Sequence, residues 1–259
     1  MNNDKAILVV SFGTSYVEAL NKTISKIEED IQNKFTDYKV FHAFTSKMII
    51  KKLESNNFYV NSVIKAIEEM IDQNVKELIV QPTHVINGLE NTLMINEIKN
   101  YSNQFDSIKI GKPLLSSAYD CQKLIDILSN EFFYLKSDEV LVCMGHGTSN
   151  QANAAYLALD NTLKDLGYKN IHIGTMKGSQ NLDTIIKKLK QDNLKKVTLF
   201  PLMIVAGNHA INDMSSDKEN SWKSILLNNG FQVKCVIKGL GEIKAIREMI
   251  IEHLNNVIE

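Results

Sequence analysis

The sequence has little of several features that mark particular protein classes. It holds only three prolines and one tryptophan among 259 residues, and no low-complexity tract interrupts it. Hydrophobic residues make up 44% and charged residues 23%, which is the balance of a folded globular chain and not of a disordered or fibrous one. The apolar run Ala6–Val10 is too short for a signal peptide or a membrane span. We therefore expect a cytoplasmic protein without a membrane partner.

Cysteine and net charge are also scarce. Cys121, Cys143 and Cys235 are odd in number and form no C-x-x-C motif, so neither a disulfide framework nor a structural zinc site is indicated, and buried thiols are expected. Lys and Arg number 29 against 30 Asp and Glu, which leaves a formal net charge of −1. No global positive field exists to attract nucleic acid, and we expect no nucleic-acid partner.

Short β-branched segments alternate with segments of helical period. The predicted strands of the first half are 7–10, 39–44, 77–81 and 107–111, and the predicted helices are 17–34, 62–73, 89–102 and 118–132. This order is typical of βαβ units and a parallel sheet.

The second half repeats the first. Gly-Thr-Ser stands at 13–15 and 147–149, and Ile-Ile-Lys-Lys-Leu at 49–53 and 185–189. Because such matches recur in order, the sequence predicts an α/β protein of two similar lobes. We expect an N-terminal lobe over 1–136 and a C-terminal lobe over 137–259, each a parallel sheet of about four strands flanked by helices, with a cleft between them.

The candidate site residues follow from this arrangement. Ligands of open α/β sheets bind beyond the carboxyl ends of the strands. Aligning the two halves at the prolines that close their third strands places Glu90 opposite His209, and aligning their first strands places Phe12 opposite His146. A symmetric scaffold that carries different chemistry at equivalent positions is what a functional cleft would show.

Two imidazoles and a carboxylate suit a divalent ion such as Co²⁺, Ni²⁺, Fe²⁺ or Zn²⁺. Two or three donors leave coordination positions open, as a protein that passes its metal on requires. Histidine also titrates near neutrality, so the same residues could accept protons.

Each candidate has a simpler interpretation. His146 stands between two glycines and could be a turn residue or a phosphate-site residue. Asn208 could cap a helix and leave His209 merely exposed. Glu90 could be a carboxylate favoured at a helix start, and His84 a hydrogen-bonded residue at a strand end.

Several motifs together resemble one family, the anaerobic sirohydrochlorin cobalt chelatases, which are class II, ATP-independent tetrapyrrole chelatases. The motifs are Leu8-Val-Val-Ser-Phe-Gly-Thr-Ser-Tyr, Ala43-Phe-Thr-Ser-Lys-Met-Ile-Ile, His84-Val-Ile-Asn-Gly-Leu-Glu, Pro113-Leu-Leu-Ser-Ser, Met144-Gly-His-Gly and Pro201-Leu-Met-Ile-Val-Ala-Gly-Asn-His-Ala-Ile-Asn-Asp-Met. They extend over nearly the whole chain.

The resemblance implies insertion of Co²⁺ into sirohydrochlorin or precorrin-2 without a nucleotide, in anaerobic cobalamin biosynthesis. It implies that His146 and His209 serve as metal ligands or proton acceptors, that Glu90 assists deprotonation or metal approach, and that His84 lines the pocket. Ser11 and Thr14, from the first of these motifs, are predicted to bind the substrate as well.

The sequence departs from the family at one position. Relatives often carry a glutamate just after the second strand of the C-terminal lobe, where this chain has Gly174-Thr-Met-Lys177-Gly178. Lys177 is therefore predicted to bind a propionate or acetate of the macrocycle, and its charge would disfavour a bound cation.

Other functions stay open at this point. Lys177 motivates a ferrochelatase-like or metal-removing enzyme that acts on another tetrapyrrole, with Fe²⁺ or Ni²⁺ as the metal. Two lobes around a cleft would also suit a non-catalytic tetrapyrrole or metal carrier. A phosphate-handling enzyme fits least, because the chain has no Walker loop. A homo-oligomer is possible in each case.

Overall fold

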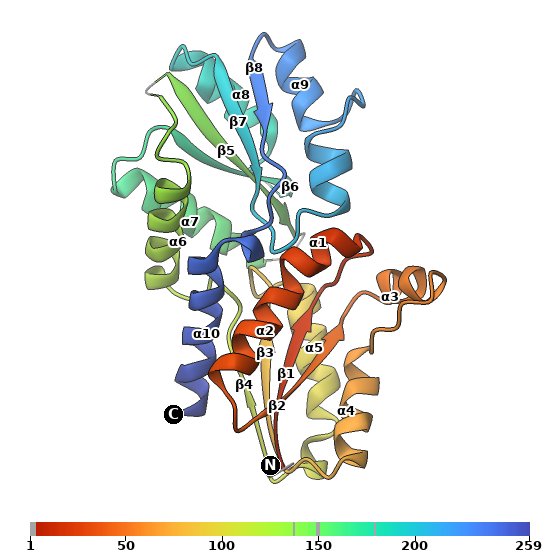
Figure 1. Cartoon of the computed structure of the whole chain (residues 1–259). Helices are drawn as coiled ribbons and strands as arrows, with labels where there is room; N and C mark the ends of the chain where they lie inside the picture. The colour runs from red at the N-terminus through yellow and green to blue at the C-terminus, as the bar shows by residue number, and fades with distance from the viewer. Residues whose placement is uncertain (1–3, 137, 149–150, 179) are drawn as a thin grey trace. The chain divides into compact units, whose positions relative to one another are not determined.

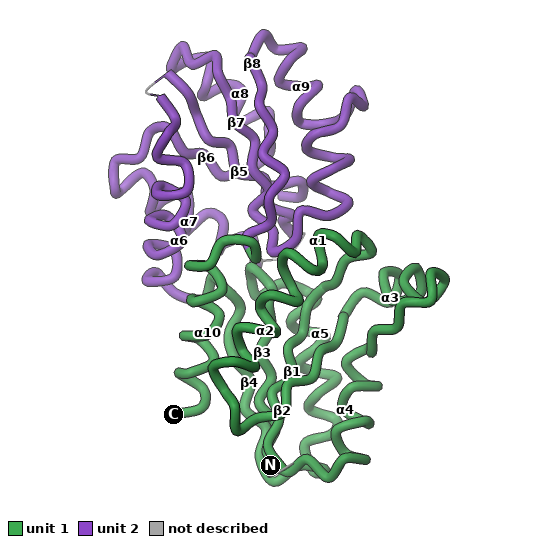
Figure 2. Tube along the Cα trace, in the orientation of Figure 1, with its two compact units in different colours: residues 1–116, 241–259 green, residues 117–240 purple. Residues whose placement is uncertain are grey.

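The chain forms two compact units. The computed structural model describes residues 4–136, 138–148, 151–178 and 180–259. Unit 1 comprises Met1–Ser116 and Gly241–Glu259, and unit 2 comprises Ser117–Leu240 (Figure 2). Ser149 of the repeated Gly-Thr-Ser motif lies outside the described residues.

This division differs from the predicted lobes, 1–136 and 137–259. Helix α6 (Ala118–Glu131) packs against α7 (Ala154–Asp165) and so belongs with unit 2. The last helix, α10 (Lys244–Ile258), packs against α2, β3 and β4 and so belongs with unit 1 (Figure 1).

Unit 1 is built on a four-stranded parallel sheet in the order β2-β1-β3-β4. Its strands are β1 (Lys5–Ser11), β2 (Lys39–Phe44), β3 (Glu77–Pro82) and β4 (Ser107–Ile110). Its α-helices are α1 (Val17–Lys22), α2 (Ile24–Lys34), α3 (Lys47–Glu54), α4 (Val63–Asp72), α5 (Leu89–Lys99) and α10. It also has two short 3₁₀ turns, η1 (Ser102–Gln104) and η4 (Leu240–Glu242). The turn η4 begins one residue before the second segment of the unit.

The alternation of side chains along β1 produces the layers of unit 1. Ala6, Leu8 and Val10 point to a core that includes Ile67 of α4 and Met94 of α5. Helices α2 and α10 contact the sheet as well, at β2 and at β3 and β4. The central strands are buried, as expected of a parallel sheet covered by helices.

One predicted helix is interrupted. The sequence suggested a single helix over 17–34, but α1 ends at Lys22 and α2 begins at Ile24. Thr23 between them has φ −124° and ψ −83°, and its hydroxyl donates to the Ala19 carbonyl at 2.6 Å. A threonine hydroxyl that bonds to the preceding turn offers the backbone an alternative to the helical pattern.

Unit 2 repeats the topology of unit 1. Its four-stranded parallel sheet has the order β6-β5-β7-β8, which is the order of unit 1 with each strand replaced by its counterpart. The strands are β5 (Glu139–Gly147), β6 (Ile171–Lys177), β7 (Lys196–Pro201) and β8 (Gln232–Cys235). The other elements are α6, η2 (Gln151–Asn153), α7, α8 (Leu182–Gln191), the π-helical turn η3 (His209–Met214) and α9 (Trp222–Asn228). The predicted internal repeat and parallel sheets are confirmed.

The core of unit 2 is likewise arranged on the faces of its sheet. Val140, Val142 and Met144 of β5 pack with Leu189 of α8 and Trp222 of α9. The three cysteines are unpaired: Cys121 and Cys143 are buried and Cys235 is partly buried, as predicted for thiols that act as small core residues.

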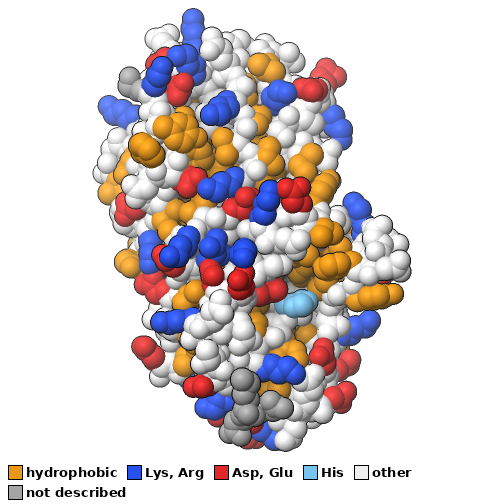
Figure 3. Space-filling view, in the orientation of Figure 1, with side chains coloured by type: hydrophobic (Ala, Val, Ile, Leu, Met, Phe, Trp, Pro, Cys, Tyr) orange, Lys and Arg blue, Asp and Glu red, His pale blue; other side chains and the backbone are white. Residues whose placement is uncertain are grey.

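Two surface properties bear on function. On the face drawn in Figure 3, basic and acidic side chains are interspersed, in keeping with the net charge of −1. Over the described ranges, none of the helices is both long enough and apolar enough to cross a membrane.

Candidate active site

His146 lies at the carboxyl end of β5, on the central strand of unit 2. Its Nδ1 lies 2.9 Å from the Gly147 carbonyl oxygen. A carbonyl oxygen only accepts hydrogen bonds, so Nδ1 carries the proton and the lone pair of the neutral imidazole stands on Nε2.

Glycine on either side of His146 allows this strand end to pack closely. A Cβ on Gly145 would lie 2.7 Å from the Tyr156 ring. Gly147 has φ +70°, and a Cβ there would lie 2.1 Å from the Lys177 carbonyl oxygen. Tyr156, from α7, is buried; burial raises the pKa of its phenol to about 12, and the Gly147 backbone opposes this shift. The packing of this strand end therefore requires glycine on both sides of His146.

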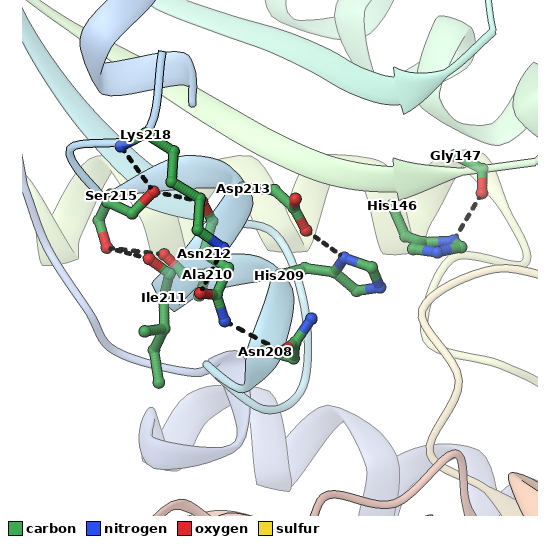
Figure 4. Close-up of polar contacts among 11 residues, drawn as sticks. His146, Gly147, Asn208, His209, Ala210, Ile211, Asn212, Asp213, Ser215 and Lys218 are labelled. Carbon is green, nitrogen blue, oxygen red and sulfur yellow. Dashed lines mark hydrogen bonds and ion pairs between the residues drawn. The ribbon is translucent and has the colours of Figure 1, made fainter. Parts of the chain in front are cut away.

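His209 is the first residue of the π-helical turn η3 that follows β7. Its Nδ1 lies 2.7 Å from Oδ2 of Asp213, four residues later on the same turn (Figure 4). Asn208 does not cap this turn with its side chain; its Oδ1 instead accepts from the Asn212 amide at 3.0 Å. Asn208 therefore stands at the N-cap position, as interpreted, but without a side-chain cap bond.

The two imidazoles form a pair within unit 2. Their ring centroids are 4.9 Å apart and their planes are inclined at 56°. Burial, followed by the charge of His209, holds the pKa of the His146 imidazole below its usual value, and the bond to Gly147 opposes this shift. His146 is therefore a neutral nitrogen donor at neutral pH.

Lys177 is the last residue of β6 and is paired in register with Gly147, directly after His146. Its side chain is exposed. The positive charge of Lys177 is a further, smaller cause of the lowered pKa of His146, so the cation acts on His146 electrostatically.

Glu90 is the second residue of α5 and lies in the first turn of that helix, beyond the end of β3. Gly88 stands at the N-cap without a side-chain cap, so a carboxylate in the first turn is favoured by the helix dipole. Glu90 belongs to unit 1 and the histidine pair to unit 2, so its action beside the pair stays a prediction.

His84 also lies beyond the end of β3, and its environment is unusual. Both ring nitrogens are buried, and neither has a hydrogen-bond partner among the described residues. Burial lowers the pKa of His84 to about 4. A neutral imidazole with two unsatisfied nitrogens is a costly group to bury, and such a group fits a side chain that bonds to a ligand or to water.

The hydroxyls of Ser11 and Thr14 form hydrogen bonds within unit 1. Ser11 is buried, and its Oγ lies 2.7 Å from the Thr83 hydroxyl. Thr14 is also buried, and its hydroxyl accepts from the Tyr16 backbone N–H at 3.2 Å. Both hydroxyls thus hold the strand-end loops of unit 1, and a role for either in substrate binding stays a prediction.

Sequence reasoning did not assign two residues that support the histidines, Asp213 and Tyr156. The contact of Asp213 with His209 could have been predicted, because a spacing of four residues places both side chains on one side of a helical turn. Tyr156 has no such signal, since its contact with Gly145 depends on how α7 packs over β5.

The donor set of the pair is small. Among residues 4–136, 138–148, 151–178 and 180–259, no group of three His, Cys, Asp or Glu side chains is arranged to hold a metal ion. Two imidazole nitrogens leave most coordination positions of a divalent ion free for another ligand. This arrangement is suited to a metal that is passed on and not to one held permanently.

The chain is similar to known cobalt chelatases over almost its whole length. A family model described as cobalt chelatase (CbiK) matches residues 5–259. The sirohydrochlorin cobaltochelatase of Salmonella typhimurium is 36% identical over 255 residues, covering 98% of this chain and 96% of the relative. The sirohydrochlorin cobaltochelatase CbiKC of Nitratidesulfovibrio vulgaris is 31% identical over 257 residues, covering 98% and 90%.

The fold has a counterpart among solved structures. SirB from Bacillus subtilis, solved with Fe³⁺, superposes with a TM-score of 0.67 at 12% identity and covers 98% of this chain and 95% of that one, which shows a shared fold. With the family model spanning almost every residue and two relatives above 30% identity, the chain belongs to the cobalt chelatase family.

Proposed function

We propose that this chain inserts Co²⁺ into sirohydrochlorin without a nucleotide, and that His146 and His209 receive the metal. The proposal combines the activity named for its two relatives with one observation, the histidine pair in which each Nδ1 is occupied by an oxygen acceptor. Both Nε2 atoms are thereby left as metal donors. A metal ion bound by only two protein donors can pass to the four nitrogens of a macrocycle, which replace those donors.

Metal insertion also requires proton acceptors. Two pyrrole N–H protons leave the ring as one divalent ion enters, so the net charge of the ring system is unchanged. The histidines are suited to accept a proton once their nitrogens no longer bind metal, and we propose Glu90 as an additional acceptor.

We propose that Lys177 binds a carboxylate of the macrocycle. Sirohydrochlorin carries acetate and propionate side chains, and Lys177 is an exposed cation beside the histidine pair. His84 is proposed as a second substrate contact, because its ring nitrogens are buried without partners in the described part of unit 1. The expected cytoplasmic location and homo-oligomer stay predictions.

The test is metal insertion followed by the visible spectrum of the macrocycle. His146→Ala and His209→Ala should each reduce the insertion rate by roughly 10²–10⁴-fold, the range typical of a positioned proton-transfer group. His42→Ala is a matched control, since His42 is a half-exposed histidine within β2 of unit 1. Insertion at the wild-type rate by both alanine variants would refute the site.

Lys177 favours a second possibility, that the physiological metal is Fe²⁺ or Ni²⁺ or that the enzyme removes metal from another tetrapyrrole. Rates with Co²⁺, Fe²⁺ and Ni²⁺ in competition, and with haem offered as substrate, distinguish these activities. Lys177→Glu should strengthen Co²⁺ binding by the protein alone, because it replaces a cation that repels Co²⁺ by a carboxylate that can bind it. The same change should weaken binding of the macrocycle, whose carboxylates lose their cationic partner. Stoichiometric binding without turnover would indicate a carrier.

A further inference from the structure

The two histidines of the pair are supported by different kinds of acceptor. His146 Nδ1 bonds to a neutral backbone carbonyl that belongs to the next residue of its own strand. His209 Nδ1 bonds to a carboxylate oxygen of Asp213 at 2.7 Å. Only the second acceptor is a side chain, so only the support of His209 can be removed by substitution.

The local structure holds Asp213 in place. Residues 209–214 form a π-helical turn in which the Ser215 N–H donates to the Ala210 carbonyl at 3.2 Å, and the Ser215 hydroxyl donates to the same carbonyl at 2.8 Å. Turns of this kind are rare and occur often at functional sites. Residues four apart on one turn lie on the same side, which sets the Asp213 carboxylate beside the His209 ring (Figure 4).

The bond determines what His209 presents. A carboxylate only accepts hydrogen bonds, so it selects the imidazole form with hydrogen on Nδ1 and leaves the lone pair on Nε2. Histidines that bind metals commonly bond their other nitrogen to a carboxylate, which fixes the ring orientation and makes the donor nitrogen more basic. Without this acceptor, the ring is free to rotate and to carry its hydrogen on Nε2, a form that cannot bind metal there.

We infer that Asp213 is the positioning residue of this site: through its bond to Nδ1 it holds the His209 ring with Nε2 free to receive the metal. The role of the metal rests on the proposed function, but the state of the ring does not. Asp213 acts through His209 and is not itself a metal donor in this assignment.

The primary test is a two-bond ¹H–¹⁵N spectrum of histidine-labelled protein without metal at pH 8, with His209 assigned from His209→Gln. The wild type should show His209 with hydrogen on Nδ1. In Asp213→Ala the His209 signals should move to the form with hydrogen on Nε2 or to a mixture, whereas His146 should keep hydrogen on Nδ1. A wild-type spectrum with hydrogen on Nε2 of His209 would overturn the inference without any variant.

The second test measures Co²⁺ alone binding to the same proteins by calorimetry. Asp213→Ala should bind Co²⁺ about 10–100-fold more weakly, the usual effect of removing a residue that supports a metal ligand. Asp213→Glu, which retains a carboxylate, should recover part of this loss. Unchanged affinity in Asp213→Ala overturns the inference.

Asn212→Ala is the matched control. It removes another side-chain bond between residues four apart on the same turn, Asn212 to Asn208 at 3.0 Å, without touching His209. An equal loss of Co²⁺ affinity in this variant would show that Asp213 acts only by stabilising the turn, and would overturn the positioning role.

Insertion into sirohydrochlorin separates the two proposals. If the wild type inserts no metal while the ring state and Co²⁺ affinity respond to Asp213 as described, the proposed function fails and the positioning role stands. If the wild type inserts Co²⁺ and Asp213→Ala does so at the same kcat and KM, the positioning role fails and the proposed function stands.

Discussion

His172 offers a direct test of the energetics of unit 2. It lies on β6, is 3% exposed, and its Nε2 has no partner among the described residues. Its Nδ1 lies 3.5 Å from Nζ of Lys188 on α8. Burial first, and then the charge of Lys188, lower the pKa of His172 to about 4, while Asp160 and Asp192 oppose the shift and Lys164 adds to it. Replacing His172 by leucine removes the titrating group and puts an apolar side chain of similar size in its place.

The magnitude follows from the two pKa values. In the unfolded chain a histidine titrates near 6.5, so between about pH 6.5 and pH 4 the unfolded chain holds a proton that the folded unit does not. The contribution of His172 to stability is therefore lost as the pH falls. At about 1.4 kcal/mol per pKa unit, the loss approaches roughly 3 kcal/mol at pH 4 and is about 2 kcal/mol at pH 5.

Other groups titrate in the same range, so the comparison of two proteins is essential. His84, with its pKa near 4, loses stability with acid in the same way, whereas burial raises the pKa of Glu28 to about 7, so that Glu28 adds stability as the pH falls from 7 to 4.5. Both contributions cancel when His172→Leu is subtracted from the wild type.

The assay is urea unfolding at several pH values, followed by the fluorescence of Trp222. This residue is the only tryptophan of the sequence and is buried in unit 2, where it lies over Gly174 of β6. The free energy of unfolding of His172→Leu, relative to the wild type, should rise by about 2 kcal/mol between pH 8 and pH 5. His42→Leu, at the half-exposed histidine of β2, should show a smaller change. A difference for His172→Leu that does not vary with pH would refute the reasoning.

Three further predictions concern packing. Gly147→Ala should destabilise unit 2 by more than the roughly 1–2 kcal/mol of a left-handed residue, because its Cβ would also overlap the Lys177 carbonyl. Gly88→Ala, with its nearest contact at 3.7 Å, should lose only the roughly 0.5–1 kcal/mol of an alanine at the N-cap of α5; urea unfolding measures both variants. Tyr156→Ala should destabilise unit 2 by about 3–5 kcal/mol, because the ring is buried and lies against Gly145; a loss below about 1 kcal/mol in urea unfolding would contradict this packing. Arg247→Ala should lower the free energy of unfolding by about 2 kcal/mol, because the guanidinium bonds to Asp30 at 2.6 Å and to two carbonyls. Lys244→Ala, which removes one partner of an exposed ion pair, should be nearly neutral. Unfolding followed by circular dichroism measures both variants, and equal effects would refute this assignment.

Much of the fold can be predicted from the sequence because the local periodicity and the internal repeat are strong. Apolar strands such as Leu8–Val10 and Val140–Val142 are buried on both sides, and the repeat predicts that the two sheets share one strand order. The same repeat points to the strand ends, and from there to His146 and His209, which the structure places side by side.

The remaining features depend on contacts that no local pattern reveals. The ion pair between Arg247 and Asp30 joins residues 217 positions apart and attaches α10 to unit 1. A single boundary at residue 136 therefore assigns α10 to the other unit. The break at Thr23 accompanies a bond from its hydroxyl to the Ala19 carbonyl, and helical periodicity does not reveal such a bond. The hydroxyls of Ser11 and Thr14 look available in sequence, but the structure uses both internally.

The order of the units along the chain has a consequence for biosynthesis. The polypeptide leaves unit 1 at Ser116 and re-enters it at Gly241, so the last helix of the unit emerges from the ribosome after all of unit 2. Unit 2 is continuous and can complete its sheet while synthesis proceeds, whereas the surface of unit 1 that receives α10 stays uncovered until α10 has been synthesised. At the usual 5–20 residues per second, the roughly 120 intervening residues delay that docking by about 6–25 seconds, a period in which a chaperone could recognise the apolar surface awaiting α10.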